Sequence, residues 1–262
     1  MRFDVITLFP ELFGPFLNHG INRRAYASGQ VEVRLWNPRD HAEGNYRRVD
    51  DRPFGGGPGM VMMAEPLYRC WQAIRADRAE GEPVPTVLFS PLGRRMDHGV
   101  VAEQAEGRGA ILVCGRYEGI DQRFIDACVD LQWSLGDFVL SGGELAALAL
   151  LDAVARLQPG VLNDEGSHQQ DSFNPALDGL LDCPHYTRPE SWDGPAGPAP
   201  VPPVLMSGHH GQIEAWRRQQ RLRLTAECRP DVLEAVRARG ALSPKDEAFL
   251  RDQTGQMPRP KP

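Results

Sequence analysis

The chain has 262 residues, 41% of them hydrophobic, and a formal net charge of −6. This length suits one or two domains with a sizeable buried core. The most apolar helical pattern, residues 145–157, is too short to cross a membrane and carries Asp152 and Arg156. The N-terminus lacks a signal-peptide pattern, and the 5 cysteines are widely spaced without a CxxC pair, which disfavours disulfides and zinc. We therefore expect a cytoplasmic protein with reduced thiols.

Strand and helix patterns alternate along the first part of the chain. We predict strands at residues 3–8, 31–36, 86–89, 110–114 and 138–140. We predict helices at residues 65–77, 120–128 and 144–157. Such alternation is typical of an α/β domain with a mostly parallel sheet covered on both faces.

The pattern changes after Pro159. Residues 160–175 form a polar stretch that cannot build a core, and we interpret it as a linker that orders when a substrate arrives. Beyond it the chain is predicted to form a small helical domain with a Pro/Gly loop and a terminal tail. Helices are predicted at residues 212–224, at 230–239 and after the N-cap Ser243, the loop at 193–200 and the tail at 256–262.

Charge is distributed unevenly along the chain. Residues 203–262 carry 11 Lys and Arg against 7 Asp and Glu, whereas residues 1–202 carry 18 against 28. A basic C-terminal part is what an RNA-binding surface requires, because phosphate contacts supply most of the sequence-independent affinity. An ordinary solvated helical surface has the same composition, so charge alone leaves both interpretations open.

Glycine-rich turns interrupt the apolar pattern of residues 112–148 twice. The glycines concerned are Gly115, Gly119, Gly136, Gly142 and Gly143. Glycine lets the main chain approach a ligand closely, so that its N–H and C=O groups can bind a flat polar molecule such as adenine. Two tight strand-to-helix turns are the structural alternative.

The usual nucleotide-binding motifs are absent from the sequence. There is no G-x-x-x-x-G-K-[ST] for phosphates. The run GGGPG at residues 55–59 fails the G-x-G-x-x-G pattern at its last glycine, and it follows the polar run 47–52 rather than a strand. A Rossmann dehydrogenase or Rossmann methyltransferase is therefore disfavoured.

Four segments match a known family. They are RPFGGGPGM (52–60), CGRYEGID (114–121), GDFVLSGGE (136–144) and LLDCPHYTRPE (180–190). With these segments in order, residues 1–229 resemble the bacterial tRNA (guanine-N1)-methyltransferases, the TrmD family of the SPOUT class. The resemblance implies methyl transfer from S-adenosyl-L-methionine to N1 of guanine 37 of tRNA, next to the anticodon, by a homodimer. It also implies a trefoil knot, which general rules of chain topology do not predict.

The resemblance also implies a domain plan. Residues 1–163 are expected to form the knotted catalytic domain that binds S-adenosylmethionine, and residues 175–262 a helical tRNA-binding domain. Residues 164–174 are the expected interdomain linker. The family's reaction leaves open a requirement for Mg²⁺, and the sequence offers no protein-only site for this ion.

Two catalytic residues follow from the family pattern, Asp171 as the general base and Arg156 as the cation near guanine O6. Methylation at N1 requires loss of the N1 proton, which pushes negative charge onto O6. A free aspartate, with a pKa of about 3.9, is a weak base for this proton, so the arginine has to favour the anionic guanine. The structural alternatives are a helix cap for Asp171 and a helix-surface pair with Asp152 for Arg156.

The cofactor positions implied by the resemblance lie in three segments. They are Ser90, Pro91, Leu92, Gly93, Gly115, Tyr117, Glu118, Gly119, Ser134, Leu135, Gly136, Asp137, Phe138, Val139, Leu140, Ser141, Gly142 and Gly143. We expect main-chain groups of Leu135, Gly136, Val139 and Leu140 to contact the adenine, and Glu118 to hold a polar or cationic part of the cofactor. The alternatives are a surface acid at a helix N-terminus for Glu118 and a core aromatic for Tyr117. The loop 47–59 is expected to contact RNA and the cofactor edge.

Two features depart from the family pattern, and three histidines are expected to have no catalytic or metal-binding role. Many members have proline where this chain has Ala146, and residues 194–200 lengthen a loop. We interpret His185 as a hydrogen-bonded structural histidine, and His209 and His210 lack the further ligands of a zinc site. Two other functions remain as alternatives: another SPOUT RNA methyltransferase, and a noncatalytic protein that binds RNA or S-adenosylmethionine.

Overall fold

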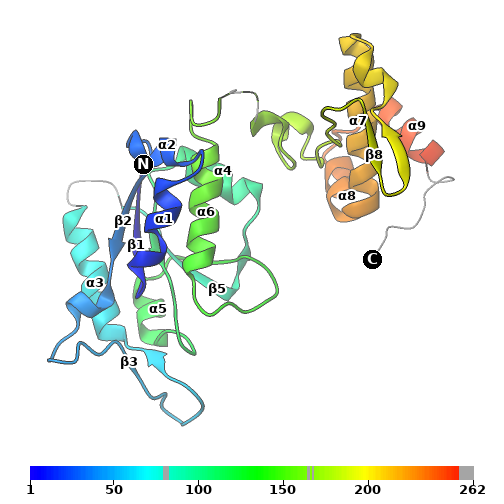
Figure 1. The fold of residues 1–262 in the computed structure, drawn as a ribbon. Helices are drawn as coiled ribbons and strands as arrows, with labels where there is room; N and C mark the ends of the chain where they lie inside the picture. Colours follow the sequence, from blue (N-terminus) through cyan, green and yellow to red (C-terminus); the bar gives the residue numbers. More distant parts are fainter. Residues whose placement is uncertain (79–82, 164–165, 167, 254–262) are drawn as a thin grey trace. The chain divides into compact units, whose positions relative to one another are not determined.

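A computed structural model describes residues 1–78, 83–163, 166 and 168–253. The chain divides into two compact units, Met1–Asn163 and Asp164–Pro262 (Figure 1). The predicted tail at residues 256–262 lies outside the described residues, as does part of the predicted linker 164–174. No helix in the described part of the chain is long and apolar enough to span a membrane.

A five-stranded sheet in the order β2-β1-β6-β5-β7 forms the centre of the first unit. Its strands are β1 (Arg2–Ile6), β2 (Glu32–Trp36), β5 (Thr86–Arg95), β6 (Ile111–Val113) and β7 (Leu131–Ser134). Every pairing in this sheet is parallel. The predicted α/β class with a mostly parallel sheet is therefore confirmed.

Helices cover both faces of the sheet (Figure 1). One face packs against α1 (Gly14–Asn18), α2 (Arg23–Ala27), α4 (His98–Glu106) and α6 (Glu144–Arg156), and the other against α3 (Ala64–Asp77) and α5 (Gln122–Cys128). Because side chains alternate along a strand, Phe3 and Val5 enter one core cluster and Ile6 the other. This double burial explains why the strands read as continuous apolar runs.

The predicted strand at residues 138–140 is wrong. These residues lie in a loop, and the Val139 side chain is 83% exposed. The last strand of the sheet is instead β7, which pairs with β5 and places Trp133 in the core. Its short sequence LQWS alternates too weakly to be distinguished from the more apolar triplet beyond it.

The chain also contains a short hairpin and several 3₁₀ turns. A small antiparallel hairpin of β3 (Asp50–Asp51) and β4 (Val61–Met62) carries the glycine-rich residues 52–60 between its strands. The 3₁₀ turns are η1 (Pro10–Leu12), η2 (Pro38–His41), η3 (His168–Gln170), η4 (Pro175–Leu177) and η5 (Pro203–Met206), the last three in the second unit.

The second unit is built around three helices of its described residues, which share one apolar cluster. They are α7 (His210–Cys228), α8 (Pro230–Ala238) and α9 (Pro244–Gln253). The cluster contains Leu180, Leu222, Leu233, Val236 and Leu250. The predicted N-cap at Ser243 is confirmed, because its hydroxyl accepts the Asp246 N–H at 3.2 Å and the Asp246 carboxylate accepts the Ser243 N–H at 2.9 Å.

The prediction of an irregular loop at residues 193–200 is also wrong. This segment forms an antiparallel hairpin of β8 (Ser191–Gly194) and β9 (Gly197–Pro200). Gly197 has φ of +98° at the turn, where glycine avoids the strain of a side chain. The prolines and glycines that suggested a loop therefore belong to a two-stranded ribbon.

Candidate functional site

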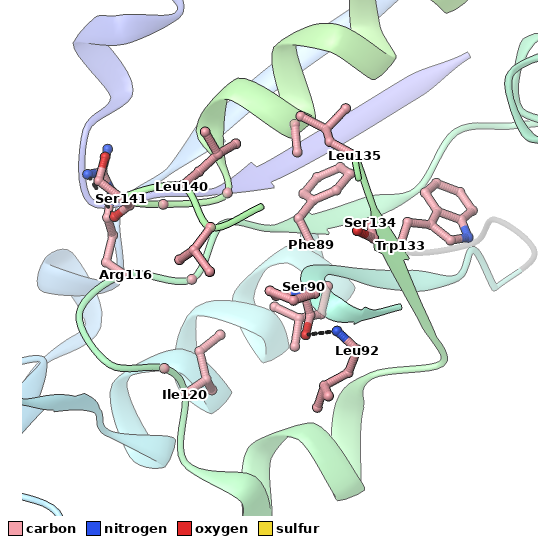
Figure 2. Close-up of a pocket in the computed structure, with 18 of the residues that line it drawn as sticks. Phe89, Ser90, Leu92, Arg116, Ile120, Trp133, Ser134, Leu135, Leu140 and Ser141 are labelled. Atoms are coloured by element: carbon pink, nitrogen blue, oxygen red, sulfur yellow. Dashed lines mark hydrogen bonds between the residues drawn. The ribbon is translucent and has the colours of Figure 1, made fainter. Parts of the chain in front are cut away.

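A cavity of about 470 Å³ opens where the middle of β5 lies beside the carboxyl ends of β6 and β7 (Figure 2). The carboxyl ends of parallel strands meet at one edge of a sheet, where ligands of α/β proteins bind. Residues 88–92 within β5 and the two loops that follow β6 and β7 form most of the walls. Apolar side chains such as Phe89, Ile120 and Trp133 lie beside glycine-rich main chain in the lining.

The cavity collects the predicted cofactor positions except Gly93 and Asp137. The predicted residues that line it are Ser90, Pro91, Leu92, Gly115, Tyr117, Glu118, Gly119, Ser134, Leu135, Gly136, Phe138, Val139, Leu140, Ser141, Gly142 and Gly143. These positions come from three separate segments of the sequence, and the fold brings them to one place.

The two exceptions have other environments. A Cβ added at Gly93 would collide with the main chain of Gln132 and Trp133, so this glycine lets β5 pack tightly against β7. Asp137 has a 91% exposed side chain and pairs with Arg95 at 3.1 Å. In the described structure Gly93 therefore packs against the main chain of β7, whose Trp133 lines the cavity, and Asp137 is exposed to solvent.

Several lining residues were missed by the sequence analysis. They are Leu88, Phe89, Arg116, Ile120, Gln122, Ile125, Trp133 and Ala146. A signal was available for Arg116 and Ile120, which lie inside the matched segment CGRYEGID. Ala146 lies in the first turn of α6, and Ala147 there donates a regular helical hydrogen bond to the Gly143 carbonyl at 3.0 Å. The helix start is therefore regular without the family's proline.

The loop after β6 is held by main-chain hydrogen bonds to the neighbouring hairpin. The Glu118 N–H donates to the Met60 carbonyl and the Met62 N–H to the Gly119 carbonyl, both at 2.9 Å. A Cβ on Gly59 would collide with the Glu118 side chain. These contacts place the glycine-rich residues 52–60 beside the cavity.

Tyr117 lies in the same loop in a conformation that non-glycine residues rarely adopt, with φ of +60°. The residue is 45% exposed, which contradicts the alternative of a core aromatic. Partial burial raises the pKa of the Tyr117 hydroxyl, as does the negative charge of Asp50. The hydroxyl also accepts a hydrogen bond from Arg39 at 3.4 Å. A strained, polar residue in a cavity wall is typical of a ligand site.

The loop after β7 is fixed at both of its ends. The Ser134 hydroxyl donates to the Gly136 carbonyl at 3.0 Å and lies 3.1 Å from the Gly136 nitrogen. At the other end, the Gly143 N–H donates to the Gly115 carbonyl at 3.1 Å. A Cβ on Gly143 would lie 2.8 Å from the Cys114 Cα, so only glycine allows this approach of the two loops.

An ion pair lies at the end of the cavity where the two loops meet. The Arg116 Nε is 3.0 Å from the Glu144 Oε2, and the Thr7 hydroxyl donates to the Glu144 Oε1 at 2.9 Å. Burial and the nearby Glu144 carboxylate raise the pKa of the Cys114 thiol well above its usual range, so this buried cysteine is not a nucleophile.

The predicted catalytic pair is divided between the two units. Arg156 is the last residue of α6 in the first unit, and Asp171 follows η3 in the second. The Asp171 N–H donates to the His168 carbonyl at 3.3 Å, and its carbonyl accepts the Asn174 N–H at 3.2 Å. Asp152, the suggested surface partner of Arg156, accepts a hydrogen bond from Asn22. The roles of Arg156 and Asp171 stay a prediction.

The histidine and metal-site predictions concern the remaining titratable side chains. The His185 Nε2 lies 2.8 Å from the Asp182 carboxylate, in keeping with a hydrogen-bonded structural role. Within residues 1–78, 83–163, 166 and 168–253, no three His, Cys, Asp or Glu side chains are grouped so as to hold a metal ion.

Comparison with known proteins identifies the family. The pattern of the family described as tRNA (Guanine-1)-methyltransferase TrmD matches residues 1–235. The chain belongs to this family. It is 72% identical over 98% of its length to the whole tRNA (guanine-N(1)-)-methyltransferase of Paracidovorax citrulli. The proteins of the same description from Polaromonas sp. and Cupriavidus necator are 70% and 55% identical, each over 96% of this chain and 96% and 95% of their own lengths.

Membership of the TrmD family makes the chain a tRNA (guanine-N1)-methyltransferase, and a methyltransferase of this kind uses S-adenosylmethionine as methyl donor. The cavity fits that donor in size, because small-molecule sites commonly measure roughly 300–1,000 Å³. It also fits in chemistry, since apolar side chains lie beside glycine main chain that a flat polar base can approach. Gly142 and Gly143 leave no room for side chains at the junction of the loops.

Proposed function

We propose that this TrmD-family chain binds S-adenosylmethionine in the cavity beside β5, β6 and β7 and methylates N1 of guanine 37 of tRNA. The observation that carries the proposal is the convergence of the predicted cofactor positions on one cavity. Main-chain groups of Leu135, Gly136, Val139 and Leu140 bind the adenine, and Glu118 holds a polar or cationic part of the donor. The substrate places the reaction in the cytoplasm.

The catalytic part of the proposal assigns proton removal to Asp171 and charge stabilisation to Arg156. The donor supplies an activated methyl group. Asp171 accepts the N1 proton, and Arg156 stabilises the negative charge that then develops on guanine O6. Support for both roles comes from the family pattern of the sequence. Arg156 ends α6, about 18 Å along the helix from the first turn that borders the cavity, so it acts on a guanine bound beyond the donor.

The assembly part of the proposal has three elements. The first unit is the knotted catalytic domain, with the knot formed by the loops around the cavity, and residues 164–174 link it to the helical domain of residues 175–262. Two chains form a homodimer, in which a site joins the cavity of one chain to Asp171 of the other. The second unit binds tRNA, which is supported by the excess of 11 basic over 7 acidic residues in residues 203–262.

Nucleoside mass spectrometry tests the function directly. Unmodified tRNA is incubated with the full chain and S-adenosylmethionine. One part is digested to nucleosides to identify the modification, and another part is cut by a ribonuclease into oligonucleotides to locate it. We expect 1-methylguanosine at the position next to the anticodon. A ribose methyl group or a methyl group on another base would favour a different SPOUT enzyme, and no modified nucleoside despite binding of both ligands would favour a noncatalytic protein.

Two companion measurements test the remaining elements. Native mass spectrometry reports whether the chain is a dimer. Repeating the reaction with EDTA, with and without added Mg²⁺, reports whether the ion is needed.

A further inference from the structure

The Arg116–Glu144 pair is more deeply buried than an ordinary surface ion pair. The Glu144 side chain is the first of α6, and the residue is only 1% exposed. Its two carboxylate oxygens lie 3.1 and 3.0 Å from the Arg116 Nε, and Thr7 donates to one of them. A buried charge of this kind is maintained only when partners compensate its desolvation.

The pair also joins the two loops that form the cavity. Arg116 comes from the loop after β6, and its Nη1 donates to the Ser141 carbonyl in the loop after β7 at 3.2 Å. Figure 2 shows Arg116 and Ser141 together at one end of the cavity. The guanidinium also lies over the Phe9 ring, 4.4 Å from its centre. A side chain on Gly142 would collide with both members of the pair.

The charge of this pair matters for a methyl donor. Arg116 lines the cavity and brings a fixed positive charge to its wall. S-adenosylmethionine carries a positive sulfonium, whereas the product S-adenosylhomocysteine has a neutral thioether. An uncompensated arginine in the wall would therefore disfavour the donor relative to the product, because charges near a partly buried site interact strongly.

We propose that Glu144 is a positioning residue that neutralises Arg116 and so sets the preference of the cavity for the cationic donor over the neutral product. The proposal rests on the function proposed above, in which this cavity holds S-adenosylmethionine. The Arg116–Ser141 hydrogen bond holds the two loops of the wall together. The negative charge of Glu144 lets the cavity distinguish the cationic donor from the neutral product.

Isothermal titration calorimetry on the full-length protein tests this with two ligands, S-adenosylmethionine and S-adenosylhomocysteine. Glu144→Gln keeps the shape and an acceptor for Thr7 but removes the charge. We expect the ratio of the two dissociation constants to shift toward the product by roughly 3- to 10-fold. Glu103→Gln is the matched control, since Glu103 is an exposed acid on α4 outside the cavity lining and the ratio should stay unchanged.

Two substitutions at Arg116 separate charge from geometry. Arg116→Lys keeps the charge but cannot bond Glu144 and Ser141 in the same fork, so both ligands should weaken equally. Arg116→Gln removes the positive charge, so the ratio should move toward the donor, opposite in sign to Glu144→Gln. Circular dichroism checks folding, and if Glu144→Gln does not fold, the sign of the Arg116→Gln shift decides.

The outcomes are distinguishable from failure of the proposed function. If the wild-type protein binds neither ligand, the cavity is not the donor site and the proposed function fails. If the wild type binds both but Glu144→Gln and Arg116→Gln change both affinities equally, the pair is only structural and this inference is overturned.

Discussion

In the first unit, close main-chain contacts at glycines and one buried ion pair hold the cavity walls, whereas in the second unit partly exposed ion pairs connect the helices. In the first unit the Gly143 N–H meets the Gly115 carbonyl at 3.1 Å. In the second, Arg218 pairs with Asp178 at 2.6 Å and with Asp246 at 3.0 Å. The difference predicts that the first unit is sensitive to the size of a side chain, and the second to charge and pH.

The largest expected effect concerns Asp171, which belongs to the second unit but is assigned to the chemistry. Asp171→Asn cannot accept the N1 proton, and we expect methylation in a single turnover to slow by roughly 10³-fold. Binding of S-adenosylmethionine and of tRNA should change little, as calorimetry and filter binding would show. The matched control is Asp193→Asn, an exposed aspartate on β8. Turnover equal to wild type would remove Asp171 from the mechanism.

Removal of a charge from the second unit should cost stability. Asp246→Ala deletes the partner of Arg218 and the reciprocal cap with Ser243, and we expect a loss of about 2–3 kcal/mol in the free energy of unfolding. Denaturant titration measures it, with the exposed Asp252→Ala on the same helix as control. An equal effect of both substitutions would contradict the importance of the ion pair.

The same residue gives a pH dependence. Burial raises the pKa of Asp246, but the Arg218 guanidinium and the Ser243 hydrogen bonds outweigh burial and hold it below its usual range. A depressed pKa means that the stabilisation is present above the unfolded pKa of about 3.9 and is lost as the pH falls through the lower folded value. The difference in stability between wild type and Asp246→Ala should therefore shrink below about pH 4.

In the first unit the sensitive property is side-chain size. Gly143→Ala places a methyl group against the Cys114 main chain, and overpacking of this kind costs about 1–3 kcal/mol. We expect the dissociation constant for S-adenosylmethionine to rise roughly tenfold, since tenfold corresponds to about 1.4 kcal/mol. Gly211→Ala in α7 is the control, because its added Cβ meets nothing within 4 Å. Unchanged donor binding in Gly143→Ala would show that the loops do not need this close approach.

The smallest effect is expected for a single basic residue of the second unit. Arg217 lies partly exposed on α7, and Arg217→Gln should weaken tRNA binding roughly threefold while reducing the salt slope by about 1. Binding titrations between low and moderate salt measure both quantities. Arg75→Gln in the first unit, where Arg75 lies over the Trp71 ring, should leave the slope unchanged. A larger loss in Arg75→Gln would move the RNA surface to the first unit.

The elements were predictable wherever one local signal dominated. The apolar runs around Val5 and Leu112 and the helix beginning at Glu144 were visible in the sequence because burial and periodicity act locally. The cap at Ser243 was visible for the same reason. Strand β7 was not, because LQWS becomes a strand only through pairing with β5, which lies some 40 residues away along the chain.

The features of the site likewise separate into those that the sequence predicted and those that depend on tertiary contacts. The sequence by itself determined the family, the glycines at positions 115 and 143, and the segments that form the cavity, because each is a contiguous match. Only the tertiary structure decided that Gly93 packs behind the wall, that Asp137 faces solvent, and that Arg116 pairs with a buried Glu144. These outcomes depend on which main chain or charge lies opposite a residue. That neighbour is distant in sequence, and folding alone brings it into contact.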